Sequence, residues 1–256
     1  MHFLLTPIEL FQGEMLFAIH LQIAGITIQD IRDFLASIKH GQGYMLSEEL
    51  HYHPQLHCFS MDDDALLQQL LFVVRDEAFY MEGAPKQNVH LLQENQLLIP
   101  PSTWNRITPF ISKVEQISLA YNNKLYSNVS YLDTPPPLHF YVKQNENGYA
   151  MQVQGLTSAI VLPSYQIVIV NGDLYELSRQ SISQLIEVKD LLEQQGLLEI
   201  YIAAEQLDYF LEMVVPKLKK IGHVEISPTL RKQRMKTPLV AKVYLDRLKN
   251  RLLQRR

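Results

Sequence analysis

Residues 207–256 read LDYFLEMVVPKLKKIGHVEISPTLRKQRMKTPLVAKVYLDRLKNRLLQRR. The pattern predicts a helix, a short strand, a basic connection and a hairpin. From Lys217 to Arg256 the stretch holds thirteen Lys or Arg residues against only Glu225 and Asp246, which gives a formal charge of +11. More than half of the chain's 23 basic side chains therefore lie in its last forty residues.

The preceding 216 residues carry the opposite charge. They hold ten basic and 25 acidic side chains, a formal −15, so the overall charge of −4 is the sum of two oppositely charged parts. Such asymmetry indicates a polyanion partner, or an acidic protein surface, near the C-terminus. Lys and Arg bind nucleic-acid phosphates by releasing condensed counterions, without reading the base sequence.

Twelve basic side chains of this segment are candidates for phosphate contacts. They are Lys217, Lys219, Lys220, Arg231, Lys232, Arg234, Lys236, Arg247, Lys249, Arg251, Arg255 and Arg256. The alternatives are a solvated face or a surface that docks on an acidic neighbour, because basic residues on a helix and a hairpin need not share one side. No base-reading motif accompanies them, so the expected contact with nucleic acid is independent of base sequence.

The overall composition is typical of a soluble globular protein, with 47% hydrophobic and 20% charged residues. No run of eighteen apolar residues occurs, so we expect no membrane partner. The opening MHFLLTPIELFQ lacks the basic region and the cleavage site of a signal peptide. A single cysteine, Cys58, excludes an internal disulfide and fits a reducing compartment, which predicts a cytoplasmic location.

Residues 1–130 contain helix and strand patterns in alternation. The expected helices cover Ile28–Lys39, residues 63–72 and residues 103–112. Their expected N-caps are Thr27, Ser60 and Ser102, whose side-chain oxygens can accept from the first free amides. The expected strands are Met15–Ile23, Val89–Leu92 and Val114–Leu119.

Three consecutive prolines, Pro135 to Pro137, mark the best internal boundary, because proline resists both helix and sheet. We therefore expect an N-terminal α+β sub-domain over residues 1–130, a linker over 131–137 and a C-terminal sub-domain over 138–256. The fold class is expected to be α+β, with antiparallel sheets and helices packed on one face.

The C-terminal sub-domain is rich in strand patterns. A hairpin is expected over Leu138–Lys143 and Tyr149–Gln154, and Asn171-Gly172 can supply the positive φ angles of a second tight turn. The other expected strands are Ala159–Pro163, Gln166–Val170, Leu174–Leu177, Leu198–Ala203 and His223–Ile226. One expected helix runs from Ser178 or Ser181 to Gln195, and another covers Glu205–Lys220 with a kink at Pro216. A last hairpin is expected to begin at Pro238–Leu245.

A group of potential metal ligands lies at His51, His53, His57 and Cys58. On a strand the three histidines would face one side and Cys58 the other, and no second Cys/His pair completes a tetrahedral zinc site. We therefore expect a half-buried strand whose histidines make local hydrogen bonds, with Cys58 packed against its neighbours.

Asp62, Asp63 and Asp64 are explained as the acidic start of a helix, where carboxylates interact favourably with the helix dipole, and not as a divalent-ion site. The chain has no phosphate-binding loop, no dinucleotide fingerprint, no nucleophile elbow and no His-Glu-x-x-His motif. We expect neither a cofactor, nor a bound metal, nor catalysis by this chain.

Four motifs resemble a known family. They are Val161-Leu-Pro-Ser164, Asn171-Gly-Asp-Leu-Tyr-Glu-Leu177, Val215-Pro-Lys-Leu-Lys-Lys220 and Thr237-Pro-Leu-Val-Ala-Lys-Val-Tyr-Leu-Asp246. They are similar to the helicase-associated region that precedes the ATPase motor in bacterial Swi/Snf helicases. The resemblance implies a DNA-dependent ATPase parent whose motor, on the same polypeptide, is the partner of this chain. It also implies that the chain is cut from a longer protein.

The sequence thus predicts a non-catalytic accessory region that positions or regulates a Swi/Snf motor, with a basic surface for duplex DNA. The alternative is a protein-interaction module that docks on its own motor or on a partner without touching nucleic acid. An enzyme of another type would need a pocket of convergent titratable groups, which only coordinates can reveal.

Overall fold

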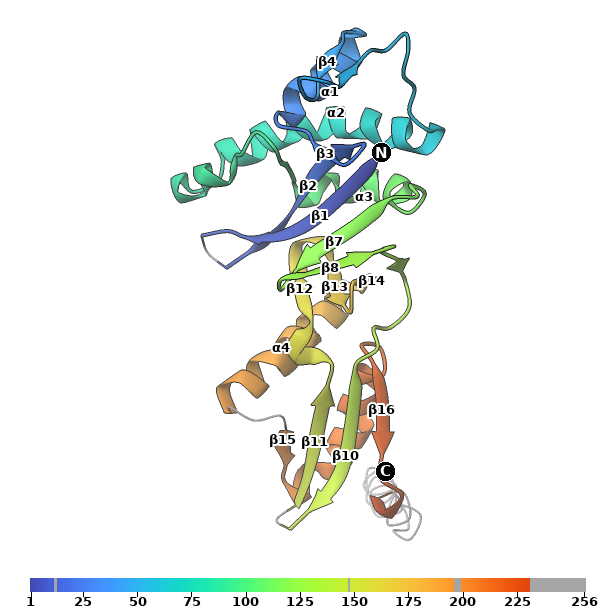
Figure 1. The fold of residues 1–256 in the computed structure, drawn as a ribbon. Helices are drawn as coiled ribbons and strands as arrows, with labels where there is room; N and C mark the ends of the chain where they lie inside the picture. Colours follow the sequence, from blue (N-terminus) through green and yellow to red (C-terminus); the bar gives the residue numbers. More distant parts are fainter. Residues whose placement is uncertain (12, 147, 196–198, 231–256) are drawn as a thin grey trace, which may run out of the picture. The chain divides into compact units, whose positions relative to one another are not determined.

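The computed structural model describes residues 1–11, 13–146, 148–195 and 199–230 (Figure 1). The chain divides into two compact units, each made of two segments. The first combines Met1–Pro137 with Gly155–Lys189, and the second combines Leu138–Gln154 with Asp190–Arg256. Residues 155–189 belong to the first unit, so the boundaries of the two units differ from those of the expected sub-domains. The sub-domains over residues 1–130 and 138–256 remain a prediction.

The α+β class is confirmed, and most strand pairs are antiparallel. The largest sheet of the first unit has the order β3-β2-β1-β7-β8, with β6 paired to β2. Its strands are β1 (His2–Glu9), β2 (Met15–Ile23), β3 (Ile26–Thr27), β6 (Leu97–Ile99), β7 (Ile117–Tyr121) and β8 (Lys124–Ser127). Only β1 and β7 run parallel in this sheet, so segments more than 100 residues apart meet at its centre.

β1 is not among the strands expected from the sequence, and Pro7 within it argues against a central strand. The structure resolves the conflict through register. Pairing with β7 involves only Phe3, Leu4 and Leu5, whereas Pro7 pairs with Phe17 of β2 alone. Pro7 thus lies on a part of β1 that has one neighbour, where a missing amide hydrogen leaves no ladder bond broken.

Two helices are bounded by side-chain caps. α1 (Ile31–His40) begins after Asp30, whose carboxylate accepts from Asp33 N at 2.9 Å, so the expected cap at Thr27 was wrong. α2 (Met61–Glu82) begins after Ser60, whose hydroxyl accepts from Asp63 N at 3.1 Å, as predicted. α2 is a full ten residues longer than expected at its C-terminal end, because Glu77 interrupts the apolar pattern while being buried.

Glu77 is buried through an ion pair that the sequence pattern cannot show. Arg32 of α1 donates to both its carboxylate oxygens, from Nε at 2.9 Å and from Nη2 at 2.6 Å. Leu98 N of β6 donates to Glu77 Oε1 at 2.7 Å. Burial raises the pKa of the Glu77 carboxyl above its ordinary value, and the bonds from Leu98 and Arg32 oppose that shift. One side chain thereby joins α1, α2 and β6.

Several local expectations between residues 86 and 137 were wrong. Val89–Leu92 is not a strand but part of a 3₁₀ helix, η1 (Lys86–Leu91). α3 (Pro101–Ile111) has no side-chain cap, and the expected cap Ser102 lies inside the helix. The helix begins with Pro101, which suits the first turn because an amide hydrogen there would have no helical partner. The expected linker, residues 131–137, begins with a short strand, β9 (Tyr131–Leu132), and β8 precedes it.

Residues 155–177 add a second sheet to the first unit, with the order β12-β13-β14-β9. Its further strands are β12 (Ile160–Leu162), β13 (Ile167–Val170) and β14 (Asp173–Glu176). The turn between β13 and β14 has φ of 53° at Asn171 and 94° at Gly172, as the sequence predicted. A Cβ at Gly172 would lie 2.4 Å from the Tyr126 ring, so space as well as backbone conformation requires glycine here.

Tyr165 joins this second sheet to the first one. Its hydroxyl accepts from Phe17 N of β2 at 3.0 Å and donates to Ile99 O of β6, between two residues that face each other in the ladder. Its ring packs edge-on against Phe17 and Trp104, with centroids 5.1 Å and 5.4 Å away. Residues 155–177 are therefore tied to the centre of the first unit.

Replacing Tyr165 by Phe is expected to lower the free energy of unfolding by about 1–3 kcal/mol, because it leaves a buried amide and a buried carbonyl without a partner. Urea denaturation followed by circular dichroism measures this. Tyr175→Phe is the matched control, since the described residues provide no hydrogen bond to its hydroxyl, and its expected cost is below about 0.5 kcal/mol. Equal losses for both variants would contradict the bridging role of Tyr165.

The second unit is built on a four-stranded sheet with the order β15-β11-β10-β16. Its strands are β10 (His139–Asn145), β11 (Gly148–Gln154), β15 (Glu199–Ile202) and β16 (His223–Ile226). The expected β10–β11 hairpin is confirmed, and β16 runs parallel to β10. α4 (Arg179–Gln195) precedes β15, and Ser178 Oγ accepts from Ser181 N at its start.

The helical run before β16 differs from the expected kinked helix. It consists of η4 (Ala204–Gln206), α5 (Leu207–Tyr209), a π-helical turn η5 (Phe210–Val214) and α6 (Val215–Leu218). Pro216 lies in the first turn of α6, so the chain accommodates its missing amide hydrogen by widening the preceding turn. Phe210, Leu211, Val215 and Leu218 are the buried residues of this run.

Candidate nucleic-acid interface

The structure describes three of the twelve candidate residues: Lys217, Lys219 and Lys220. All three are exposed at the C-terminal end of α6, while Val215 and Leu218 of the same turn are buried. This is the expected amphipathic arrangement, with an apolar side toward the sheet and ammonium groups in water. The nine candidates from Arg231 to Arg256 lie outside the described residues.

Gly222 fixes the backbone that follows these lysines. A Cβ at this position would lie 2.5 Å from Leu138 O and 2.7 Å from the Phe140 ring. His223 N, the next amide, donates to the same Leu138 O at 2.7 Å. The chain therefore turns from α6 into β16 against the start of β10, and this contact fixes the direction in which α6 ends.

The lysines also have a structural explanation. Exposed acidic residues, Glu205 and Asp208, lie near the start of the helical run, and the lysines lie at its end. Opposite charges placed in this order complement the dipole of a helix and stabilise it by a few tenths of a kcal/mol each. Exposure of Lys217, Lys219 and Lys220 is thus compatible with nucleic-acid contact but does not by itself require it.

One face of the sheet in the second unit is polar. His139 of β10 faces His223 of β16, with ring centroids 5.6 Å apart, and Tyr141 faces Glu225. Lys143 Nζ donates to Glu199 Oε1 at 2.9 Å, and this bond lowers the pKa of the Glu199 carboxyl. The charges on this face largely balance, so it adds no net positive charge to the lysines.

The histidine-rich segment does not form the expected strand. Only His51 and Tyr52 are in β5, and His57 Nδ1 accepts from His53 N at 2.9 Å across the following turn. Within residues 1–11, 13–146, 148–195 and 199–230, no group of three His, Cys, Asp or Glu side chains is arranged to hold a metal ion. Cys58 is exposed, so the expectation that it is packed was wrong; it lies outside any helix or strand, after the turn that follows β5.

The three aspartates at the start of α2 have separate environments. Asp62 and Asp64 lie in the first helical turn, where their charge favours the helix. Asp63 is buried and accepts from the amino group of Met1 at 3.2 Å. This ion pair holds the start of β1 against α2 and was not apparent in the sequence.

A family model described as bacterial SNF2 helicase associated matches residues 95–255, which is more than half of the chain. The chain therefore belongs to the bacterial SNF2 helicase-associated family, and the resemblance noted in the sequence is confirmed. Neither the curated proteins nor the solved structures gave a match.

The match also locates the chain's role at a coarse level: it is an accessory region of a SNF2 helicase. Residues 1–94, which supply β1, β2, α1 and α2, lie before the matched span. In the part of the chain that the structure describes, no helix combines the length and apolar character needed to cross a membrane.

Proposed function

We propose that this chain positions or regulates the motor of its SNF2 helicase and places its basic segment, residues 217–256, against the DNA backbone. The observation that carries the proposal is the formal +11 of this segment beside −15 for the rest of the chain. In a bacterial cytoplasm, a SNF2 motor works on a polyanion, and a segment of this charge is attracted to it. The motor of the same polypeptide is the other proposed partner.

The proposed contact is electrostatic and independent of base sequence. Each Lys or Arg that neutralises a phosphate releases condensed counterions, so affinity falls as salt rises. Lys217, Lys219 and Lys220 are exposed and close together in the chain, which supports their part in such a surface. The remaining candidates, from Arg231 to Arg256, are proposed from their charge alone.

Changing Lys217, Lys219 and Lys220 together to Gln is expected to weaken binding to a duplex. At 0.1 M salt the affinity should fall by about eightfold for each phosphate that the variant no longer neutralises. Fluorescence anisotropy of a labelled duplex, at several salt concentrations, measures both the affinity and its salt slope. The slope should fall by about 0.9 for each such phosphate.

The matched control changes Lys39, Lys86 and Lys113 of the first unit to Gln, which removes the same charge. These lysines are also exposed. If both triple variants bind equally well, the three C-terminal lysines do not contact phosphates. If the unchanged protein shows no salt slope, the DNA surface as a whole is wrong.

A second function is favoured by the charge separation along the helical run, from Glu205 and Asp208 to Lys217. A dipolar surface of this kind fits a protein partner that presents both signs of charge, and the module would then dock on its own motor. In that case the isolated chain is expected to ignore DNA and yet change the ATPase rate of the separate motor.

A further inference from the structure

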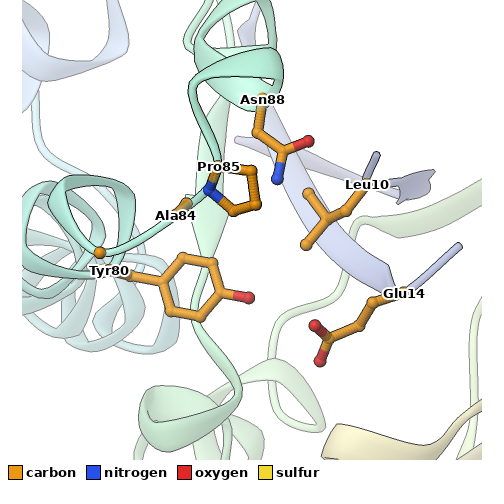
Figure 2. A pocket seen from close by; sticks show the side chains of 7 residues that line it. Leu10, Glu14, Tyr80, Ala84, Pro85 and Asn88 are labelled. Carbon is orange, nitrogen blue, oxygen red and sulfur yellow. The ribbon is translucent and has the colours of Figure 1, made fainter. Parts of the chain in front are cut away.

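The first unit contains a pocket of about 370 Å³ that has no part in the proposed DNA contact. One wall is the connection between β1 and β2, which contributes Leu10 and Glu14. The other is the C-terminal end of α2 and the start of η1, which contribute Tyr80, Ala84, Pro85 and Asn88. We call this the Glu14 pocket. Figure 2 shows it from close by.

The anionic group of the Glu14 pocket is held in place but has no cationic partner. Ser164 Oγ donates to Glu14 Oε1, which orients the carboxylate. Glu14 is exposed, and among the described residues it takes part in no ion pair. Its second oxygen is therefore available to a ligand that carries positive charge.

The end of α2 adds to the negative character of this place. α2 has 22 residues, and its last turn contains no basic residue, whereas Glu82 lies in it. The C-terminus of a helix carries partial negative charge, which usually favours Lys, Arg or His nearby. A cation in the Glu14 pocket would meet both the carboxylate and this helix end.

The walls of the pocket suit a long side chain with a charged tip. Leu10, Pro85 and the Tyr80 ring supply apolar surface, along which methylene groups can pack. Figure 2 shows the Tyr80 hydroxyl pointing toward Glu14. Burial, with a smaller contribution from the Glu14 charge, raises the pKa of Tyr80, so its phenol remains neutral and its ring can face a cation.

Asn88 provides a hydrogen-bond donor at the opposite end. The residue is only 1% exposed, and its Oδ1 accepts from Phe11 N at 2.8 Å, which fixes the orientation of the side chain. In Figure 2 its amide nitrogen points into the space between Pro85 and Leu10. This nitrogen can donate to a backbone carbonyl of a bound peptide while Glu14 accepts from the side-chain tip.

The surroundings of the pocket fit a protein partner better than a free small molecule. Phe11, in the connection between β1 and β2, is 63% exposed, and Val89, in η1, is 56% exposed. Exposed apolar side chains around a polar recess are typical of docking sites for peptides and proteins. We propose that the Glu14 pocket binds an Arg or Lys side chain presented by an extended segment of a partner protein.

Titration of the whole chain with the peptide N-acetyl-Gly-Arg-Gly-amide, followed by NMR chemical shifts, tests the proposal. We expect saturable shifts at Leu10, Glu14 and Tyr80–Asn88, with weak affinity because one side chain supplies most of the contact. The same peptide with citrulline in place of Arg lacks the positive charge and is expected not to bind at this site.

Glu14→Gln is expected to weaken binding of the Arg peptide by about tenfold, the effect of losing one charge-assisted hydrogen bond. Glu48→Gln is the matched control: Glu48 is exposed, carries the same charge and does not line the pocket. Equal binding of the Arg and citrulline peptides, shifts confined to other regions, or an unchanged affinity of Glu14→Gln would each overturn the proposal. This test involves no DNA, so its result is independent of the proposed DNA contact.

Discussion

In a chain shortened to residues 95–256, close to the span that the family model matches, the part that belongs to the first unit is expected not to fold. The shortened chain keeps β6 and β7 but loses β1 and β2. β6 pairs with β2 and no other strand of the described structure, and β7 keeps only β8 as a neighbour. Leu97, Leu98 and Ile99 would lose their cover, and so would the ring of Trp104, which stacks on Phe17 with centroids 4.7 Å apart.

The measurement is straightforward, because an exposed core produces aggregation and removes cooperative unfolding. We expect residues 95–256 to be insoluble when expressed alone, or to show poor NMR dispersion at residues 95–137 and 155–189, which belong to the first unit. Co-expression with residues 1–94 is the control, since all pairing partners are then present. Well-dispersed NMR signals from residues 95–137 and 155–189 in the fragment alone would show that residues 1–94 are dispensable for its fold. The matched span would then be an independent domain.

Replacing Glu77 by Ala is expected to lower the free energy of unfolding by about 3–5 kcal/mol, which is a large fraction of the stability of a typical domain. The Glu77 side chain is 3% exposed and its partner Arg32 is 28% exposed, so the substitution leaves a half-buried guanidinium without its carboxylate. It also leaves the buried Leu98 N without an acceptor. Chemical denaturation of the variant measures the loss.

Two further variants separate the contributions of the ion pair. Arg32→Ala removes the other charge and should lower the free energy of unfolding by a similar amount. The double variant should lose less than the sum of the two single losses, because no buried charge is then left without its partner. Arg75→Ala is the control, since Arg75 forms an exposed pair with Asp76 and should cost no more than about 1 kcal/mol. Additive losses for Arg32 and Glu77 would contradict a direct coupling.

Local signals in the sequence predicted a good part of the fold. Ser60 caps α2, and Asn171-Gly172 forms the tight turn, because both depend only on neighbouring backbone groups. The β10–β11 hairpin follows for the same reason. The predictions that failed concern residues whose partners are distant in the sequence. Pro7 is tolerated in a central strand because of the register of that strand. Glu77 can be buried because it forms an ion pair with Arg32, which is 45 residues away in the sequence.

The candidate site could be predicted only as a charge pattern. Lys217, Lys219 and Lys220 are exposed, while Val215 before them and Leu218 between them are buried. Their contact with DNA stays a prediction, because a helix end attracts lysines for its own stability. The Glu14 pocket was not foreseen, since it joins residues near position 10 to residues near position 85, and only the pairing of β1 with β2 and the length of α2 bring them together.

The position of Tyr165 has a consequence for synthesis of the protein. A chain grows on the ribosome from its N-terminus, so Phe17 and Ile99 emerge well before the hydroxyl that joins them. The hairpin β10–β11, which belongs to the other unit, is translated in between. Until Tyr165 is synthesised, the Phe17 amide and the Ile99 carbonyl of the first unit lack this hydrogen-bond partner. During this interval the incomplete unit is most accessible to chaperones and proteases.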